Sequence, residues 1–346
     1  MVKKTLKPSK ALEANLRETI GVSEPGSPLG TEVALAKKFG VARMTARNVV
    51  DRLCGEGLVV RRAGIGLFVA GTARRERYLF LAGNLLWDMA MKVAKGFRTS
   101  AEKRGAEVEL FDAQGDEARL KEAIAGLKDG AFSAAAVLST HEAGVAEVVR
   151  EMAANGFRIV MIDEAVEGVA SVVSDNRLGG ALAAEALVRA GHRSLGFIGD
   201  LKADTVLARW EGFAAVAKDM NGVTPVKSDV GGVSRLGDWE AQVISAAKRI
   251  MKRKEKPSAV FCSCDAVARY AMRAFESAGL KVPGDVSIVG FDDDPIAEWT
   301  SPALTTVKQD FGRMGAEAAR LMGGASKTVT VPIEFVDRES VRRLKG

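Results

Sequence analysis

Residues 29–70, with the sequence LGTEVALAKKFGVARMTARNVVDRLCGEGLVVRRAGIGLFVA, decide the fold of the first part of this chain. Thr31 is a residue type that caps helices and Gly40 is a type that ends them, so a short helix is expected between the two. Its inward-facing residues are expected to be Val33, Leu35, Ala36 and Phe39. Residues 42–54 then repeat apolar side chains at the spacing of one helical face. That pattern predicts a second helix with a buried stripe and polar outer faces.

A β-hairpin is expected directly after these helices. Glycines at positions 55 and 57 end the helix before a first strand at residues 58–62. The sequence GIG at 64–66 then provides a turn before a second strand at residues 67–70. Helices followed by a basic hairpin form a winged helix-turn-helix, in which one helix enters the DNA major groove. A nucleotide-binding glycine loop is a poorer interpretation, because no strand-helix-strand unit surrounds these glycines.

The predicted recognition helix carries basic and polar side chains outside its apolar stripe. Arg43 and Arg47 lie one turn apart near its N-terminal end, the end that meets base edges and phosphates. A guanidinium there can form a forked contact with guanine or clamp a phosphate. The residues expected to contact DNA are Thr31, Arg43, Thr45, Arg47, Asn48, Arg61, Arg62, Gly64 and Gly66.

The same stretch resembles the GntR family of regulators. The resemblance is carried by the cap LGTE at residues 29–32, the turn ARMTAR at 42–47 and the wing at 61–69. Val33 departs from the family pattern, which often has a phosphate-contacting arginine at this position. The resemblance therefore implies a DNA-binding module that lacks one backbone contact.

Length and charge indicate several domains with different roles. The chain has 346 residues, enough for two or three domains of about 100 to 200 residues. Residues 1–77 hold 15 lysines and arginines against seven acidic residues, a net of +8, whereas the whole chain carries +6. The basic excess is thus concentrated in the predicted DNA module. We expect this module at 1–70, a polar linker at 71–77 and a larger domain at 78–346.

Composition also limits location and cofactors. The basic N-terminus leads into an amphipathic helix and not into an apolar signal segment, and no run approaches the ~18 apolar residues of a membrane span. A cytoplasmic protein without membrane contact is expected. Three cysteines, Cys54, Cys262 and Cys264, fit neither a disulfide framework nor a zinc site, so reduced thiols and no metal or cofactor are expected.

The remainder has the pattern of an α/β protein. Strand-like and helical runs alternate from residue 78 to 162 and again from 195 to 291. Such alternation predicts parallel sheets with helices on both faces. Two successive doubly wound units indicate a bilobed protein, and small ligands of such sheets bind beyond the carboxyl ends of the strands.

Residues 78–342 resemble the effector domain of LacI/GalR-type regulators, which has a periplasmic sugar-binding fold. The phrases that carry the resemblance are SDN at 174–176, RWEGF at 209–213, GDW at 237–239, PGDVSIVGFDDD from 283 and SPALTTVKQDF at 301–311. In that family the lobes exchange strands. The resemblance implies a first lobe of about 78–192 plus 308–325, and a second of about 193–307 plus 326–346.

The resemblance also implies a ligand pocket. Arg209 matches an arginine that forks onto ligand oxygens, Asp292 a carboxylate that accepts sugar hydroxyl protons, and Trp239 and Phe311 aromatic walls. Further positions that match the cleft are Trp87, Asp88, Ser139 and Asp175. Cys264 stands where the family usually has an asparagine, which weakens the expectation of a simple hexose. Outside this context, such residues would more often be surface, helix-cap or core residues.

The leading hypothesis is a ligand-controlled transcriptional regulator. It would bind a palindromic double-stranded operator as a homodimer and a small polar effector, a sugar or derivative, between its lobes. A repressor of carbohydrate genes released by inducer is the favoured form, and a corepressor-dependent regulator stays open.

Two other functional classes fit the sequence less well. A solute-binding protein of transport is opposed by the absent export signal and the fused DNA module. An enzyme is opposed by the lack of a GxSxG elbow, a Walker loop or an HExxH pair. Asp292 and Asp293 are adjacent at a strand end, so their side chains diverge and do not flank one bond.

Overall fold

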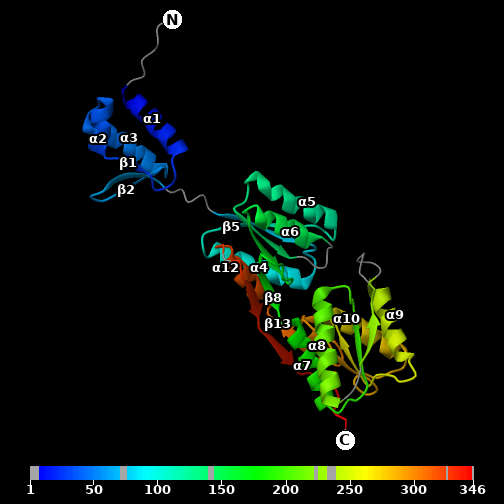
Figure 1. The fold of residues 1–346 in the computed structure, drawn as a ribbon. Helices are drawn as coiled ribbons and strands as arrows, with labels where there is room; N and C mark the ends of the chain where they lie inside the picture. Colours follow the sequence, from blue (N-terminus) through cyan, green and yellow to red (C-terminus); the bar gives the residue numbers. More distant parts are fainter. Residues whose placement is uncertain are drawn as a thin grey trace. The chain divides into compact units, whose positions relative to one another are not determined.

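The computed structural model describes residues 8–70, 76–138, 144–221, 225–231, 239–324 and 326–344 (Figure 1). The chain divides into two compact units, Met1–Glu76 and Arg77–Gly346.

The described part of the first unit, residues 8–70 and 76, contains three helices and a three-stranded antiparallel sheet of order β1-β3-β2. The helices pack on one core that includes Leu12, Leu35, Val50 and Leu53. This arrangement confirms the winged helix-turn-helix. Its elements are α1 Pro8–Val22, β1 Pro28–Gly30, α2 Glu32–Phe39, α3 Arg43–Gly55, β2 Val59–Arg62 and β3 Gly66–Val69.

Local signals account for the ends of α2. The Thr31 side chain accepts a hydrogen bond from the backbone N–H of Ala34 at 3.2 Å, and Gly40 ends the helix with φ +63°. The predicted inward face of α2 is wrong at Val33, whose side chain is 56% exposed. The helix has only eight residues and buries only Leu35 fully, so Val33 lies on its outer side.

The second unit begins with a lobe built on a six-stranded parallel sheet of order β14-β8-β7-β6-β4-β5. Helices α4 and α12 cover one face and α5 and α6 the other, and each pair encloses its own apolar cluster (Figure 1). The strands are β4 Arg77–Ala82, β5 Glu107–Asp112, β6 Ala134–Leu138, β7 Arg158–Ile162, β8 Ala170–Ser174 and β14 Thr328–Val331. The helices are α4 Asp88–Glu102, α5 Glu117–Ala125, η1 Gly126–Asp129, α6 Val145–Ala154 and α12 Phe311–Leu321.

The second lobe has a four-stranded parallel sheet of order β10-β9-β11-β12. Helices α7 and α8 pack on one face, and α9 and α10 on the other. Its strands are β9 Leu195–Gly199, β10 Val226–Asp229, β11 Ala259–Cys262 and β12 Ser287–Val289. Its helices are α7 Asn176–Arg189, α8 Asp204–Asn221, α9 Trp239–Met251, α10 Asp265–Ser277 and α11 Ile296–Trp299.

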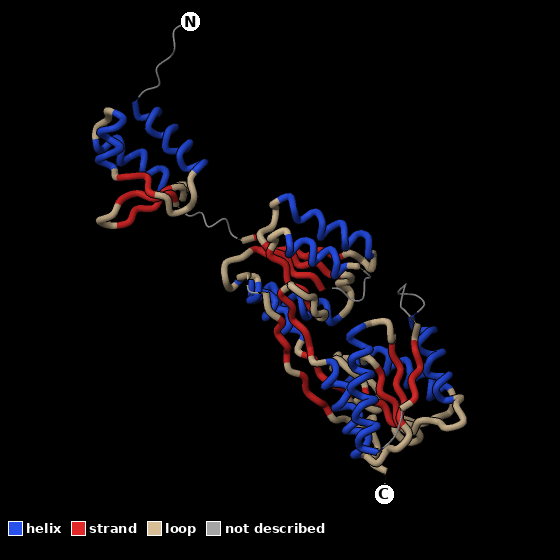
Figure 2. The backbone as a smooth tube through the Cα atoms, in the orientation of Figure 1, coloured by secondary structure: helices blue, strands red, loops and turns tan. Residues whose placement is uncertain are grey.

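A pair of antiparallel strands, β13 Thr306–Gln309 and β15 Ile333–Val336, runs between the lobes (Figure 2). Two parallel sheets with helices on both faces confirm the predicted α/β bilobed class.

The division between the lobes differs from the expectation. The family resemblance places residues 176–189 in the first lobe, but Ala183 and Leu187 of α7 pack with Phe197 in a second-lobe core. It places residues 326–346 in the second lobe, but β14 pairs with β8 in the first-lobe sheet. Strand pairing and core packing join residues distant in sequence, so periodicity along the chain does not reveal where such a crossing falls.

Glycines allow one helix pair in each lobe to approach closely. A Cβ at Gly180 of α7 would lie 1.8 Å from the Arg209 carbonyl oxygen of α8. In the first lobe, a Cβ at Gly315 of α12 would lie 2.0 Å from the Val93 carbonyl oxygen of α4. No side chain fits at such distances. The close contact of α7 with α8 sets the position of Arg209.

Candidate functional sites

The N-terminal half of α3 presents an exposed polar surface. Arg43, Arg47 and Asn48 are exposed and Thr45 is half-buried, while the apolar stripe of the same helix packs inward. The guanidinium of Arg47 makes one long ion pair, in which its Nε lies 4.0 Å from the Asp51 carboxylate. These side chains are therefore available to an outside partner, and a helix N-terminus also favours an anionic one.

The wing residues have more varied surroundings. Arg61 of β2 donates to Glu32 of α2 at 2.9 Å and also pairs with Asp51 of α3. Its guanidinium thus fastens the wing to both helices, although we expected it to contact DNA. Arg62 is exposed and stacks on Phe68, with its guanidinium carbon 4.5 Å from the ring centroid.

The remaining predicted DNA residues shape the backbone of this unit. Thr31 uses its hydroxyl to cap α2. Gly64 has φ +73° at the hairpin tip, and a Cβ at Gly66 would lie 2.9 Å from the Gly30 carbonyl oxygen. Sequence reasoning missed Met44 and Ile65, which are apolar yet exposed beside these residues. The sequence carried a signal for both, since Met44 falls outside the apolar stripe of α3 and Ile65 lies in the GIG turn.

In the second unit, Arg209 and Asp292 come together from α8 and from the turn after β12. Arg209 is 5% exposed, and its Nη1 lies 3.9 Å from the Asp292 carboxylate. Its Nε donates to the Asn176 side-chain oxygen at 2.8 Å, and Nη1 donates to the Ser263 carbonyl oxygen. The ring of Phe291 lies 3.8 Å from the guanidinium carbon. The guanidinium is thus held rigidly in one orientation.

Asp292 lies in a segment of strained backbone. Asp292 has φ +110° and Asp293 has φ +56°, a region that non-glycine residues rarely adopt. Asp265 holds this turn, since it accepts hydrogen bonds from the Thr306 hydroxyl at 2.6 Å and from the Asp294 backbone N–H at 2.8 Å. Asp293 is anchored by an ion pair with Arg338 at 2.6 Å. These contacts offset the local strain and aim Asp292 at Arg209.

The cluster is rich in buried acids. Burial raises the pKa of Asp292 well above its ordinary value, and the Arg209 guanidinium opposes this shift. Burial also raises the pKa of Asp265 to about 7. Burial raises the pKa of the Cys264 thiol to about 12, so the thiol stays neutral. The site thus has a hydrogen-bonding character and no activated thiolate.

A salt bridge crosses from the first lobe to the second beside this cluster. Lys92 of α4 lies 2.6 Å from the Asp88 carboxylate and 3.5 Å from the Asp294 carboxylate. Its ammonium is 6.0 Å from the centroid of the Phe311 ring. The two lobes are therefore linked by charge at the position where the family resemblance places a ligand.

The structure brings some predicted effector residues together and leaves others apart. Arg209, Asp292 and Cys264 form one cluster, and Asp88 and Phe311 surround Lys92. Sequence reasoning missed six partners of the cluster, although half of them lie within the quoted sequence phrases; they are Lys92, Asn176, Ser263, Asp265, Asp294 and Gln309.

Other predicted residues have structural contacts. Trp239 packs edge-to-face on Tyr270, with centroids 5.4 Å apart, against a second-lobe core. Phe311 is 2% exposed within a first-lobe core, and Trp87 packs against the same core. Asp175 is exposed and caps α7 through the backbone N–H of Leu178. Ser139 lies outside the described residues.

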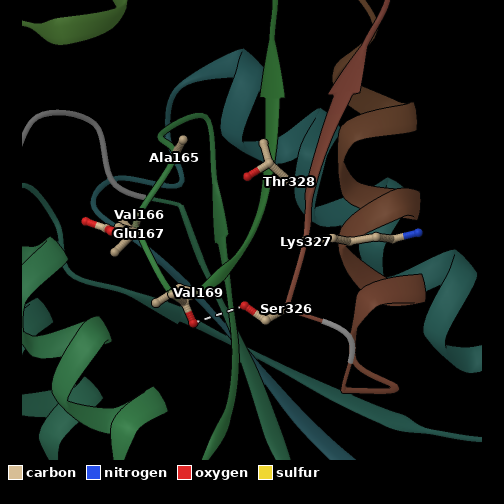
Figure 3. Close-up of a pocket in the computed structure, with 8 residues that line it drawn as sticks. Ala165, Val166, Glu167, Val169, Ser326, Lys327 and Thr328 are labelled. Carbon is tan, nitrogen blue, oxygen red and sulfur yellow. Dashed lines mark hydrogen bonds between the residues drawn. The ribbon is translucent and has the colours of Figure 1, made fainter.

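A surface depression of about 450 Å³ lies at the start of β8 and β14 (Figure 3). It is lined by residues 165–169 and 326–328, and the Ser326 hydroxyl donates to the Gly168 carbonyl oxygen at 3.1 Å across it. None of the predicted effector residues lines it. Its charged lining consists of Glu167 and Lys327, which are exposed and do not form a buried polar site.

Two further properties concern cofactors and membranes. Within the described ranges, no group of three or more His, Cys, Asp or Glu side chains is arranged to hold a metal ion. The three cysteines are free. None of the described helices is both long and apolar enough to cross a bilayer.

Comparison with known proteins assigns both parts of the chain. Residues 5–69 match the bacterial regulatory proteins of the gntR family, and residues 184–341 match the periplasmic binding protein-like domain. The HTH-type transcriptional repressor PurR of Photorhabdus laumondii is 35% identical over 172 residues, which are 47% of this chain and 49% of that protein. The chain thus matches about half the length of this curated relative.

Solved structures extend the similarity across the second unit. A LacI family transcriptional regulator from Enterococcus faecium with bound ribose is 20% identical, with a TM-score of 0.67, covering 78% of this chain and 100% of that one. The lac repressor dimer bound to operator is 22% identical, with a TM-score of 0.66, covering 79% and 96%. The chain therefore combines a winged helix-turn-helix that matches the gntR family with a second part that matches the periplasmic binding protein-like domain and shares the fold of LacI family regulators.

Proposed function

We propose that this protein is a ligand-responsive DNA-binding transcriptional regulator, a repressor of carbohydrate-metabolism genes that a sugar or sugar derivative releases. One observation carries the proposal: a unit with exposed arginines at the start of α3 is fused to a bilobed unit that holds the buried Arg209–Asp292 pair. The first feature fits a duplex and the second fits a small polar molecule. A single chain with both can couple them.

The DNA half of the proposal rests on the surface of α3 and the wing. Arg43, Thr45, Arg47 and Asn48 would enter the major groove, and Arg62 with the tip at Gly64 and Gly66 would meet the neighbouring backbone. Thr31 and Arg61 would position these elements. We infer a homodimer on a palindromic site in the cytoplasm, and the lac repressor, a relative in fold, is itself a dimer on its operator.

The effector half rests on the cluster between the lobes. Arg209 and Asp292 would bind the ligand, with Trp239 and Phe311 as aromatic walls. The further predicted positions at its margin are Trp87, Asp88, Ser139, Asp175 and Cys264. Ligand binding would bias the arrangement of the lobes and so the placement of the DNA modules. The curated relative is a transcriptional repressor. We infer the same role without catalysis here, and a corepressor mechanism or simple sugar binding are the alternatives.

The test uses the full-length protein. An operator is first selected from a random duplex library, and operator affinity is then measured while candidate sugars are titrated. We expect a palindromic consensus and a change in affinity of about 5- to 150-fold, which corresponds to ordinary coupling of 1 to 3 kcal/mol. Loss of affinity indicates an inducer and gain indicates a corepressor. A sugar that binds the protein yet leaves operator affinity unchanged would reject the coupling.

A further inference from the structure

The wing of the first unit is fastened to the helices by one arginine and two acids. Arg61 of β2 donates from Nε to Glu32 Oε1 at 3.0 Å, and its Nη2 lies 2.9 Å from the same oxygen. Nη2 also lies 2.5 Å from Asp51 Oδ1. Glu32 belongs to α2 and Asp51 to α3. The guanidinium of Arg61 therefore holds the Asp51 carboxylate in place on the surface of the recognition helix.

Asp51 also lies beside an arginine that is expected to contact DNA. Its second oxygen, Oδ2, is 4.0 Å from Nε of Arg47, one turn earlier on α3. Residues four positions apart share a helical face, so the Asp51 carboxylate lies between the guanidinium groups of Arg47 and Arg61. The side chains of Asp51 and Arg47 are both exposed, so a duplex docked on this face would meet both.

The charges at this junction oppose DNA binding in part. Among the described residues of the unit, Arg61 is the one cation that pairs with Glu32, and Asp51 has Arg61 at 2.5 Å and Arg47 at 4.0 Å. Two negative charges thus share one close positive charge beside the recognition helix. An acid at this position weakens binding to every duplex, because the phosphate backbone is the same in all sequences.

Such a penalty can increase selectivity. A protein distinguishes two partners by the difference between its affinities, and an unfavourable contact that only the correct partner compensates increases this difference. Asp51 approaches Arg47 at Nε, which leaves the two Nη groups to form a fork with guanine. Phosphates are present at every position, whereas the guanine is present only in the correct site. An acid that competes with phosphate for Arg47 therefore disfavours the wrong sites more than the right one.

From this geometry we infer that Asp51, held in place by the wing residue Arg61, is a specificity-determining residue that acts through Arg47 and disfavours duplexes lacking the base that Arg47 reads. The inference rests on the DNA half of the proposed function and deepens it. Asp51→Asn keeps the size of the side chain and removes its charge. It should bind random-sequence DNA more tightly and reduce the ratio of operator to random-sequence affinity about two- to fivefold, the range of an exposed ion pair.

The test measures this ratio for full-length variants. Labelled operator is titrated at one salt concentration and competed with a random-sequence duplex of equal length. In an Arg47→Ala background, Asp51→Asn should no longer change the ratio, because a residue that acts through another has no effect once that partner is removed. Glu56→Gln is the matched control, since Glu56 is exposed, follows the C-terminal end of α3 and pairs with Arg17 of α1 at 2.8 Å. It removes the same charge and should leave the ratio unchanged.

Three results would overturn the inference while keeping the DNA half of the proposed function. An unchanged ratio in Asp51→Asn would show that the ion pairs only stabilise the wing, whatever happens to the melting temperature. An equal change in Glu56→Gln would show a general effect of charge. A change that persists in the Arg47→Ala background would show that Asp51 does not act through Arg47. A wild-type protein with no preference among duplexes would instead overturn the DNA half itself.

Discussion

Replacing Arg47 by alanine is expected to weaken operator binding while leaving the fold and effector binding unchanged. The Arg47 side chain is 60% exposed, and its nearest carboxylate, Asp51, is 4.0 Å away at a solvent-exposed position. Such a surface pair contributes about 0 to 1 kcal/mol to stability. The first unit should therefore unfold at nearly the wild-type temperature, so a loss of DNA affinity would report a lost contact.

The size of the loss depends on what Arg47 touches. A forked contact to a base is worth about 1 to 3 kcal/mol of discrimination, so its removal should weaken the preferred site about 5- to 150-fold and relax the preference at one base pair. A phosphate contact would instead reduce the salt slope by about 0.9 per protomer. Between 50 and 200 mM salt, that slope change alters the ratio of wild-type to variant affinity about 3.5-fold for each protomer, or about 12-fold for the proposed homodimer.

The helix offers a matched control. Arg52 lies further along α3, is 59% exposed and pairs with Glu13 of α1 at 2.8 Å. Arg52→Ala removes the same charge from the same helix at equal exposure, but away from its N-terminal end. Fluorescence anisotropy with a labelled operator across the salt range would compare both variants with the wild type. If Arg47→Ala kept full affinity and slope while Arg52→Ala lost them, the docking of α3 by its N-terminal half would be wrong.

Three further perturbations test the second unit. Arg209→Ala should abolish effector binding and leave operator binding intact. It should also lower the free energy of unfolding by about 2 to 6 kcal/mol, because the buried Asn176 and Ser263 oxygens each lose a donor at about 1 to 3 kcal/mol; wild-type melting behaviour would contradict this. Gly180→Ala places a Cβ 1.8 Å from a backbone oxygen and should sharply lower the melting temperature, whereas Gly126→Ala, where no atom lies within 4 Å, should not. Because burial raises the pKa of Asp265 to about 7 from 3.8, the folded state binds the proton more tightly. Its contribution should reduce the unfolding free energy as pH rises from about 4 to 7, by up to about 1.4 kcal/mol per pH unit, and urea titrations should lose this slope in Asp265→Asn.

Local patterns in the sequence were sufficient for several elements. The cap at Thr31, the left-handed Gly40 and the buried stripe of α3 each depend on residues within a few positions of one another. The alternation of strand-like and helical runs likewise indicates the order of the elements, because the spacing of apolar side chains differs between buried strands and helices. Winged helix and α/β class could therefore be predicted from the chain alone.

Only the tertiary structure decided how distant segments share contacts. It brings Arg209 into a hydrogen bond with Asn176, 33 residues away. Within the first unit, it brings Arg61 into salt bridges with Glu32 and Asp51. It also pairs β14 with β8 and places Asp294 beside Lys92 of the other lobe. Hydrogen-bond partners and counter-charges are selected by three-dimensional proximity, which no residue spacing encodes, whereas helix ends and buried stripes are set by neighbours along the chain.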